Sequence, residues 1–247
     1  MSIYPRKSAL DMRISALKKF LIYMPGKLYI VATPIGNLKD ITFRAIETLK
    51  EVDLIACEDT RHTKKLLSHY NITTVATSYF EYNKIKKGEY LIGLLKEGKK
   101  IALVSDSGTP GISDPGFNII RSAIENNIEL TVIPGPSAFV AGLVLSGMPT
   151  DTFIFKGFLS PKSGKRRKEL ERLKETGKTI IFYESPHRIL KALEDILEVM
   201  GDIDIVIARE LTKVFEEVIR SKVSAAIQHF TEKPPRGEFV VVINVKI

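Results

Sequence analysis

A regular alternation of two kinds of segment most constrains the fold. Short runs rich in β-branched residues recur along the chain, separated by longer stretches with apolar residues at helical spacing. This pattern is typical of α/β proteins, in which helices connect largely parallel strands. In the first half, the pattern predicts strands at residues 28–33, 54–57, 101–105 and 130–133, and helices at 42–50, 63–70, 90–97, 117–126 and 137–145.

The second half repeats this organisation. It predicts strands at 153–158, 179–183, 203–208 and 239–245, a further strand at 215–219, and helices at 166–175, 187–200 and 223–230. Residues 146–150 (SGMPT) separate the halves, and their Gly and Pro are expected to end the preceding helix. We therefore expect an N-terminal extension at 1–26 and two α/β domains, at 27–147 and 148–247.

Composition and length exclude several classes of protein. With 247 residues, of which 44% are apolar, the chain can bury a sizeable core, so a disordered or fibrous protein is excluded. No apolar run approaches the roughly 20 residues that cross a bilayer. Residues 13–24 faintly resemble a signal peptide, but Lys18 and Lys19 interrupt the apolar part and no cleavage site follows. We favour an amphipathic arm, or sequence upstream of a true start at Met24.

Cysteine and histidine usage indicates where the chain acts. Cys57 has no partner for an intrachain disulfide, and four scattered histidines give no zinc pattern. We therefore expect a reducing, cytoplasmic location and no metal.

The balance of charge favours a polyanionic partner. The formal net charge is +8. Five basic residues fall within seven positions that lead into a predicted helix: Lys162, Lys165, Arg166, Arg167 and Lys168. This cluster is either a phosphate-contacting patch or a solvated helix face.

Glycine and proline gather after three predicted strands of the first half. The segments are ATPIGN (residues 32–37), SDSGTPGISDPG (105–116) and PGPS (134–137). Ligands of open α/β sheets bind beyond the carboxyl ends of the strands, and such loops let backbone approach a ligand closely. Because the common phosphate-binding motifs are missing, a ligand held by backbone groups and by Asp106 or Asp114 fits better. The alternative is that the loops are tight connections and that Asp114 caps a helix.

Two polar blocks follow other predicted strands. Glu58, Asp59, Arg61 and His62 follow the second strand, and Glu184, His187 and Arg188 follow the sixth. Structural roles are open for each block: Asp59 or Thr60 as a helix cap, Ser185 and Pro186 as N-cap and first helical residue, His187 as a structural histidine, and ion pairs of Arg61 and Arg209 with Glu58 and Glu210.

Six ordered blocks resemble one family. They are LYIVATPIGNLKDIT (28–42), CEDTRHT (57–63), SDSGTPGISDPG, PGPSA (134–138), FYESPHR (182–188) and ARELTK (208–213). Together they resemble the bacterial 16S ribosomal RNA cytidine-2′-O-methyltransferases, a branch of the tetrapyrrole methylase superfamily. The resemblance runs from about residue 28 to the C-terminus and leaves residues 1–26 outside.

The resemblance implies a class III S-adenosylmethionine-dependent methyltransferase, with two α/β domains and a cofactor cleft between them. It further implies a homodimer that methylates the ribose of cytidine 1402 in 16S rRNA of the small ribosomal subunit. The cofactor residues that it implies are Pro34, Ser105, Asp106, Gly108, Thr109, Ile112, Ser113, Asp114, Pro134, Gly135, Ser137, Ala138 and Gly237. One departure is Gly111, where a larger apolar residue is expected.

Methyl transfer to a ribose hydroxyl needs the reacting atoms held in line, a proton acceptor, and cations for the neighbouring phosphate. We expect Glu58, Asp59, Arg61 and His187 to line the acceptor side, with Arg61 on phosphate and a carboxylate or His187 accepting the proton. The residues expected to contact RNA are Arg61, Lys162, Lys165, Arg166, Arg167 and Arg188.

Two other functions remain open. One is C-methylation of a corrin or porphyrin precursor, whose acidic macrocycle also suits a basic protein. The other is a non-catalytic RNA-binding assembly factor that retains the cofactor pocket. A non-catalytic binding protein would not need three Gly/Pro-rich loops with carboxylates beside them, which argues against the assembly factor.

Overall fold

The computed structural model describes residues 26–80 and 84–245, which form two compact units. The first unit holds residues 26–32, Thr42–Asp106 and Asp114–Pro134. The second holds Thr33–Ile41, Ser107–Ser113 and residues 135–245. Apart from Gly26, the expected N-terminal extension lies outside the described residues.

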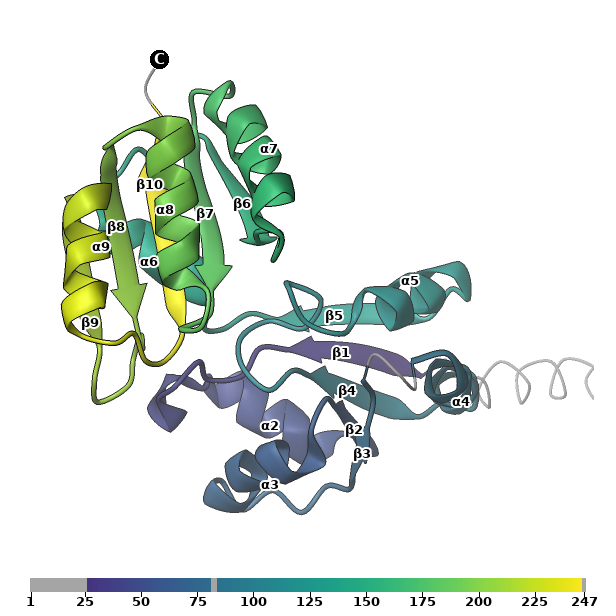
Figure 1. Cartoon of the computed structure of the whole chain (residues 1–247). Helices are drawn as coiled ribbons and strands as arrows, with labels where there is room; N and C mark the ends of the chain where they lie inside the picture. Colours follow the sequence, from purple (N-terminus) through teal and green to yellow (C-terminus); the bar gives the residue numbers. More distant parts are fainter. Residues whose placement is uncertain (1–25, 81–83, 246–247) are drawn as a thin grey trace, which may run out of the picture. The chain divides into compact units, whose positions relative to one another are not determined.

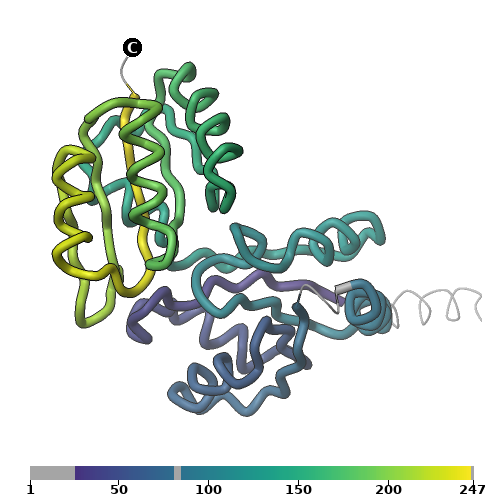
Figure 2. The backbone as a smooth tube through the Cα atoms, in the orientation of Figure 1, coloured from purple at the N-terminus to yellow at the C-terminus, as the bar shows by residue number. Residues whose placement is uncertain are grey.

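The first unit is built on a parallel five-stranded sheet. Its strands are β1 (Lys27–Val31), β2 (Leu54–Cys57), β3 (Ala76–Ser78), β4 (Lys100–Val104) and β5 (Glu129–Ile133), in the order β3-β2-β4-β1-β5. The central strands are continuously apolar because both of their faces are buried, as in Ile101, Ala102 and Leu103. Figure 2 shows β1, in purple, between β4 and β5 in teal, so strands far apart in the sequence lie side by side.

Four helices cover this sheet: α2 (Phe43–Glu51), α3 (Thr60–His69), α4 (Lys84–Lys96) and α5 (Phe117–Glu125). The strand order reverses direction after β3, so right-handed crossovers place α2 and α3 on one face and α4 and α5 on the other (Figure 1). Leu91 and Leu95 of α4 and Ile119 of α5 share one buried cluster with Leu28 and Leu103 of the sheet.

The second unit is built on a mixed sheet. Its strands are β6 (Phe153–Phe158), β7 (Thr179–Glu184), β8 (Asp204–Arg209), β9 (Glu217–Lys222) and β10 (Phe239–Asn244), in the order β6-β7-β10-β8-β9. β6 and β7 are parallel, whereas β10 runs antiparallel to both β7 and β8. The helices are α6 (Ala138–Ser146), α7 (Ser163–Lys174), α8 (Ile189–Met200) and α9 (Val223–Glu232), and a short 3-10 helix η1 (Leu38–Asp40) precedes them in the chain.

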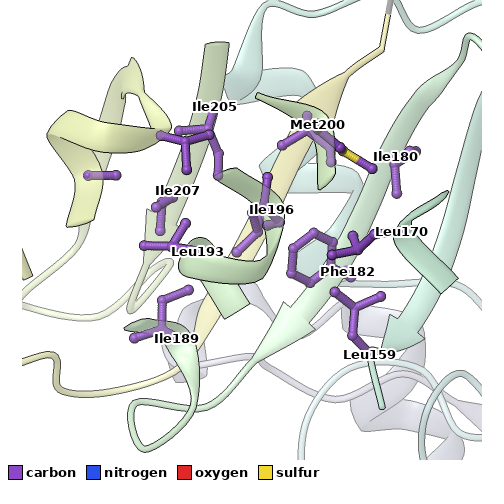
Figure 3. Packing of buried hydrophobic residues seen from close by; sticks show 14 of the residues in the cluster. Leu159, Leu170, Ile180, Phe182, Ile189, Leu193, Ile196, Met200, Ile205 and Ile207 are labelled. Carbon is purple, nitrogen blue, oxygen red and sulfur yellow. The ribbon is translucent and has the colours of Figure 1, made fainter. Parts of the chain in front are cut away.

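Strict alternation along β10 divides the second core in two. Val241 and Ile243 face the cluster that α7, α8 and α9 complete, and Figure 3 shows Phe182 of β7 and Ile196 of α8 in it. Val240 and Val242 face the opposite way, toward Leu143 of α6. α6 approaches the sheet closely, since a Cβ on Gly142 would lie 2.6 Å from Cγ1 of Val240.

The expected α/β class is confirmed, and several elements differ in detail from the prediction. β3 was not predicted, the strand expected at 215–219 forms at Glu217–Lys222, and α8 begins at Ile189 rather than at 187. Three other helices begin earlier than expected, α3 at Thr60, α4 at Lys84 and α7 at Ser163. In addition, α6 was expected to belong with the first half but packs on β7, β8 and β10 of the second sheet. The expected change of domain after residue 147 therefore differs from the observed grouping of residues.

Candidate functional site

The three Gly/Pro-rich loops meet within the second unit. Thr33 and Gly108 form an isolated antiparallel bridge, in which the N–H of Thr33 donates to the Gly108 carbonyl at 2.9 Å and the N–H of Gly108 donates back at 3.0 Å. A Cβ on Gly108 would lie 3.6 Å from Cγ2 of Ile35 and 3.9 Å from the Pro136 carbonyl. The loops after β1, β4 and β5 are thus in contact.

Positive φ angles shape the second of these loops. Gly108, Gly111 and Ser113 have φ values of 79°, 84° and 62°. The N–H of Ile112 donates to the Thr109 carbonyl at 3.2 Å, which closes a turn around Gly111. A larger residue at 111 would be strained at this φ, so glycine suits the conformation that this chain adopts there.

The third loop leads directly into a helix. Ser137 is the N-cap of α6 but makes no side-chain cap hydrogen bond, and its carbonyl accepts from the N–H of Ala141 at 3.1 Å. The phenol of Tyr183 on β7 accepts from the N–H of Phe139 at 3.3 Å. The loop that contains Gly135 and Ser137 is therefore anchored to the second sheet.

Three carboxylates gather at the carboxyl edge of the first sheet. β2 and β4 are parallel neighbours with Cys57 opposite Val104, which brings Glu58 and Asp59 next to Asp106. The N–H of Asp59 donates to Oδ1 of Asp106 at 3.2 Å. Burial, and then the charges of Asp106 and Asp59, raise the pKa of Glu58.

Asp59 and Arg61 form a local pair at the start of α3. Asp59 is the N-cap, and its Oδ1 accepts from the N–H of Arg61 at 2.8 Å. The guanidinium of Arg61 donates to both carboxylate oxygens, at 3.1 and 2.8 Å. These bonds lower the pKa of Asp59 to about 2. The capping alternative is therefore confirmed, whereas the alternative ion pair of Arg61 with Glu58 is wrong, because Arg61 pairs with Asp59.

The end of β7 holds a buried glutamate. The side chain of Glu184 accepts from the N–H of Ser185 at 2.8 Å and pairs with Arg188 at 3.2 Å. Burial raises the pKa of Glu184 more than these contacts lower it. Arg188 also donates to the Leu159 carbonyl at 2.6 Å, whereas His187 is exposed. Because Arg188 is the N-cap of α8, the alternative in which Ser185 and Pro186 begin that helix is wrong.

Arg166 was wrongly expected to contact RNA. Its side chain is 2% exposed and lies against Asp195 of α8, with Nε 2.7 Å from Oδ2. Arg167 also binds Asp195 at 2.7 Å and Glu198 at 2.5 Å. Burial would raise the pKa of Asp195, but bonds from Arg167, Ser163 and Arg166 outweigh it and lower that pKa. Arg166 and Arg167 thus link α7 to α8 through Asp195, whereas Lys162, Lys165 and Lys168 are exposed.

A further cluster lies at the end of β8, and of its residues only Gly237 was expected at the site. Glu210, with a φ of 49°, accepts from Nζ of Lys213 at 2.9 Å and from the N–H of Glu238 at 3.1 Å. A Cβ on Gly237 would lie 2.4 Å from the Glu210 carboxylate, and one on Gly36 would lie 2.5 Å from Cγ of Lys213. This cluster joins the loop before β10 to the loop after β1. Arg209 pairs with Glu217, so the alternative in which it pairs with Glu210 is wrong.

The expected cofactor residues divide between the two units. Those in the second unit are Pro34, Gly108, Thr109, Ile112, Ser113, Gly135, Ser137, Ala138 and Gly237, and those in the first are Ser105, Asp106, Asp114 and Pro134. The N-cap of α5 is Gly116 and not Asp114. Within residues 26–80 and 84–245, no group of three His, Cys, Asp or Glu side chains is arranged to hold a metal ion. Over the same described ranges, no helix is long and apolar enough to cross a membrane.

Several solved structures share this fold. A diphthine synthase has a TM-score of 0.70 at 16% identity, covering 89% of both chains. Uroporphyrin-III-C-methyltransferase from Thermus thermophilus has a TM-score of 0.62 at 18% identity, covering 89% of this chain and 95% of that enzyme. At such low identity these likenesses show the architecture alone.

Sequence comparison identifies the family. The model of the Tetrapyrrole (Corrin/Porphyrin) Methylases matches residues 27–227. The ribosomal RNA small subunit methyltransferase I of Thermotoga maritima is 51% identical over 90% of this chain and 99% of its own length. The proteins of that name from Halalkalibacterium halodurans and Bacillus subtilis are 51% and 49% identical, over 89% of this chain and 76% and 75% of theirs. The chain therefore belongs to the tetrapyrrole methylase family and, within it, to the ribosomal RNA small subunit methyltransferase I group, and it is a methyltransferase.

Proposed function

We propose that this methyltransferase uses S-adenosylmethionine to methylate the ribose 2′-hydroxyl of cytidine 1402 in 16S rRNA of the small ribosomal subunit. The observation that carries the proposal is identity of about one half to proteins named for this rRNA, over nearly the whole length of one of them. Uroporphyrin-III-C-methyltransferase is only 18% identical, so a tetrapyrrole substrate is not favoured.

The loops of the second unit suit the proposed cofactor. Gly108 and Gly111 adopt positive φ angles, and Gly237 is packed against Glu210 with no room for a side chain. Such loops can hold a nucleoside by amides and carbonyls, as the expected cofactor residues require. When bound, S-adenosylmethionine would supply an electrophilic methyl group on a sulfonium. The Gly237 loop is held by Glu210 and Lys213, so these residues would keep that part of the site in place.

The acceptor side would use residues at the carboxyl edge of the first sheet. The raised pKa of Glu58 makes this carboxylate a stronger base than an ordinary glutamate, which suits removal of a proton from a hydroxyl. Asp59 holds the guanidinium of Arg61, whose side chain is 90% exposed, in one orientation, so that it can meet a phosphate. His187 stays a second candidate for the proton.

The remaining RNA contacts would come from lysines of the α7 region. Lys162 and Lys165 are exposed, and Lys168 lies one turn further along the helix. Arg166 is excluded by its burial, and Arg167 and Arg188 are bound to carboxylates of their own unit. We therefore assign RNA binding in this region to Lys162 and Lys165 first.

A labelling experiment tests the proposal. The purified chain is incubated with S-adenosylmethionine carrying a labelled methyl group and with unmethylated small subunits, or with a tetrapyrrole precursor. We expect label in 2′-O-methylcytidine after nuclease digestion of the rRNA. Label in the tetrapyrrole would support the alternative enzyme, and tight RNA binding without transfer to either would support an assembly factor.

Variants test the acceptor residues. Arg61→Ala and Glu58→Ala are assayed for methyl transfer to small subunits at saturating cofactor, and we expect turnover to fall by roughly 10²-fold or more. Lys96→Ala, an exposed position on α4, is the matched control and should turn over like the unaltered chain. Wild-type turnover in both acceptor variants would remove this assignment.

Two further features belong to the proposal. A homodimer is expected from the family resemblance, and light scattering of the purified chain would give its mass. A cytoplasmic location follows from the proposed substrate, because bacterial ribosomal subunits are cytoplasmic. Fractionation of cells that make a tagged chain tests the second feature.

A further inference from the structure

The exposed side of α3 carries basic and neutral side chains only. The helix reads TRHTKKLLSH, and it contains no acidic residue. Thr63, Leu66 and Leu67 are its buried residues, and they face the first sheet. The opposite side, which we name the α3 basic face, consists of Arg61, His62, Lys64, Lys65 and His69, all of which are exposed.

The charges of this face are arranged at some cost to the helix. Arg61 and Lys65 are four residues apart, so two like charges lie side by side on the helix surface. Arg61 also lies in the first turn, where the helix dipole disfavours a cation. Arg61 is compensated by Asp59, but no ion pair of Lys64 or Lys65 occurs among the residues that the structure describes. An exposed helix without a binding role usually carries charges of both signs, as α2 does with Arg44, Glu47 and Lys50.

We propose that the α3 basic face binds backbone phosphates of the RNA next to the nucleotide that is methylated. This inference rests on the proposed function and adds a surface to it. The helix begins two residues after Glu58, so RNA on this face would pass beside the proposed acceptor residues (Figure 1). Ten residues of α-helix are about 15 Å long, which is enough to follow several phosphates of one strand. Lys64 and Lys65 have no planar hydrogen-bonding fork, so they bind charge rather than recognise base sequence.

A pair of double variants tests this surface. K64Q/K65Q removes two charges from the α3 basic face, and K86Q/K96Q removes two exposed charges from α4, on the opposite face of the same sheet. Binding to protein-free 16S rRNA is measured between about 50 and 200 mM KCl. Circular dichroism and the midpoint of thermal unfolding show that each variant is folded. Methyl transfer by the unaltered chain is measured separately, because it reports on the proposed function and not on this surface.

We expect K64Q/K65Q to bind the rRNA roughly tenfold more weakly at the lowest salt, and its plot of log affinity against log salt to be flatter by about 1.4 to 1.8. K86Q/K96Q should differ little from the unaltered chain. Equal losses in the two variants, or unchanged binding by K64Q/K65Q, would overturn the proposal. A loss seen with intact subunits but not with protein-free rRNA would also overturn it, since α3 would then contact a ribosomal protein. If the unaltered chain transfers no methyl group, the proposed function fails while the binding data still decide what α3 does.

Discussion

Replacing Arg166 by Met separates a structural arginine from an RNA-binding one. The substitution removes a guanidinium that is 2% exposed and keeps the apolar stem. It deletes the donors to Asp195 at 2.7 Å, to the Ser160 carbonyl at 3.2 Å and to the Lys191 carbonyl at 3.1 Å. The buried carboxylate of Asp195 then depends on Arg167 and Ser163.

The loss can be sized from these contacts. Removing one partner of a buried ion pair costs about 3–5 kcal/mol. Asp195 keeps Arg167 at 2.7 Å and Ser163 at 2.8 Å, so we expect the lower end of that range, about 3 kcal/mol. For a chain of this size, such a loss lowers the midpoint of thermal unfolding by about 6–12 °C.

Thermal unfolding and RNA binding are measured on Arg166→Met and on its neighbour variant Lys165→Met. Lys165 is exposed, so we expect its replacement to change stability by less than about 0.5 kcal/mol and to weaken RNA binding. Arg166→Met should lower the stability of the fold and leave RNA binding unchanged. If Arg166→Met keeps wild-type stability and loses RNA affinity, the assignment of Arg166 to the α7–α8 contact is refuted.

Three other outcomes are expected. Gly237→Ala puts a Cβ 2.4 Å from Oε1 of Glu210 at a φ of 83°, which costs about 1–3 kcal/mol of strain. Calorimetry should therefore show that S-adenosylmethionine binds about 5-fold to 150-fold more weakly. Unchanged affinity would mean that this loop does not contact the cofactor. The pKa of Glu58 is raised on folding, so its ionised carboxylate destabilises the folded state above the folded pKa, and this cost vanishes as the pH falls. Urea unfolding of Glu58→Gln should therefore show a gain in the free energy of unfolding at pH 7 that is lost near pH 4. A difference that does not depend on pH would contradict the raised pKa. Phe182→Ala empties a fully buried position in the second core, and urea unfolding should show a loss of about 3–5 kcal/mol; a loss below about 1 kcal/mol would mean that the core of Figure 3 is wrongly described.

Most of the fold could be predicted because buried strands carry a strong signal. β7 contains the apolar run IIF and β10 the run FVVVI, so the presence of both strands follows from the sequence. β3 has only three half-buried residues at the edge of the first sheet, and so short a run gives no periodicity. The partner of α6 could not be predicted either, because AFVAGLVLS is apolar on all sides and does not indicate which face is buried.

The candidate site was predictable where backbone conformation is the signal. Proline and glycine mark the three loops, and these loops do meet around Gly108. The burial of Arg166 could not be predicted from the sequence, because its partner Asp195 lies 29 positions further along the chain. A signal was present nonetheless, since Asp195 interrupts the apolar stripe that Ala192 and Ile196 continue, and a carboxylate there requires a cation. The Glu210 cluster gave no such signal, because the positive φ of Glu210 and the close approach of Gly237 are tertiary properties.

We expect the loops around Gly108 to hold S-adenosylmethionine, and calorimetric titration of the purified chain measures this binding. We expect saturable binding of S-adenosylmethionine and of its demethylated product. We also expect the affinity to fall in Gly108→Val, whose β-branched side chain is strained at a φ of 79°. No binding of either molecule up to about 1 mM, or equal affinity in the variant, would contradict the claim.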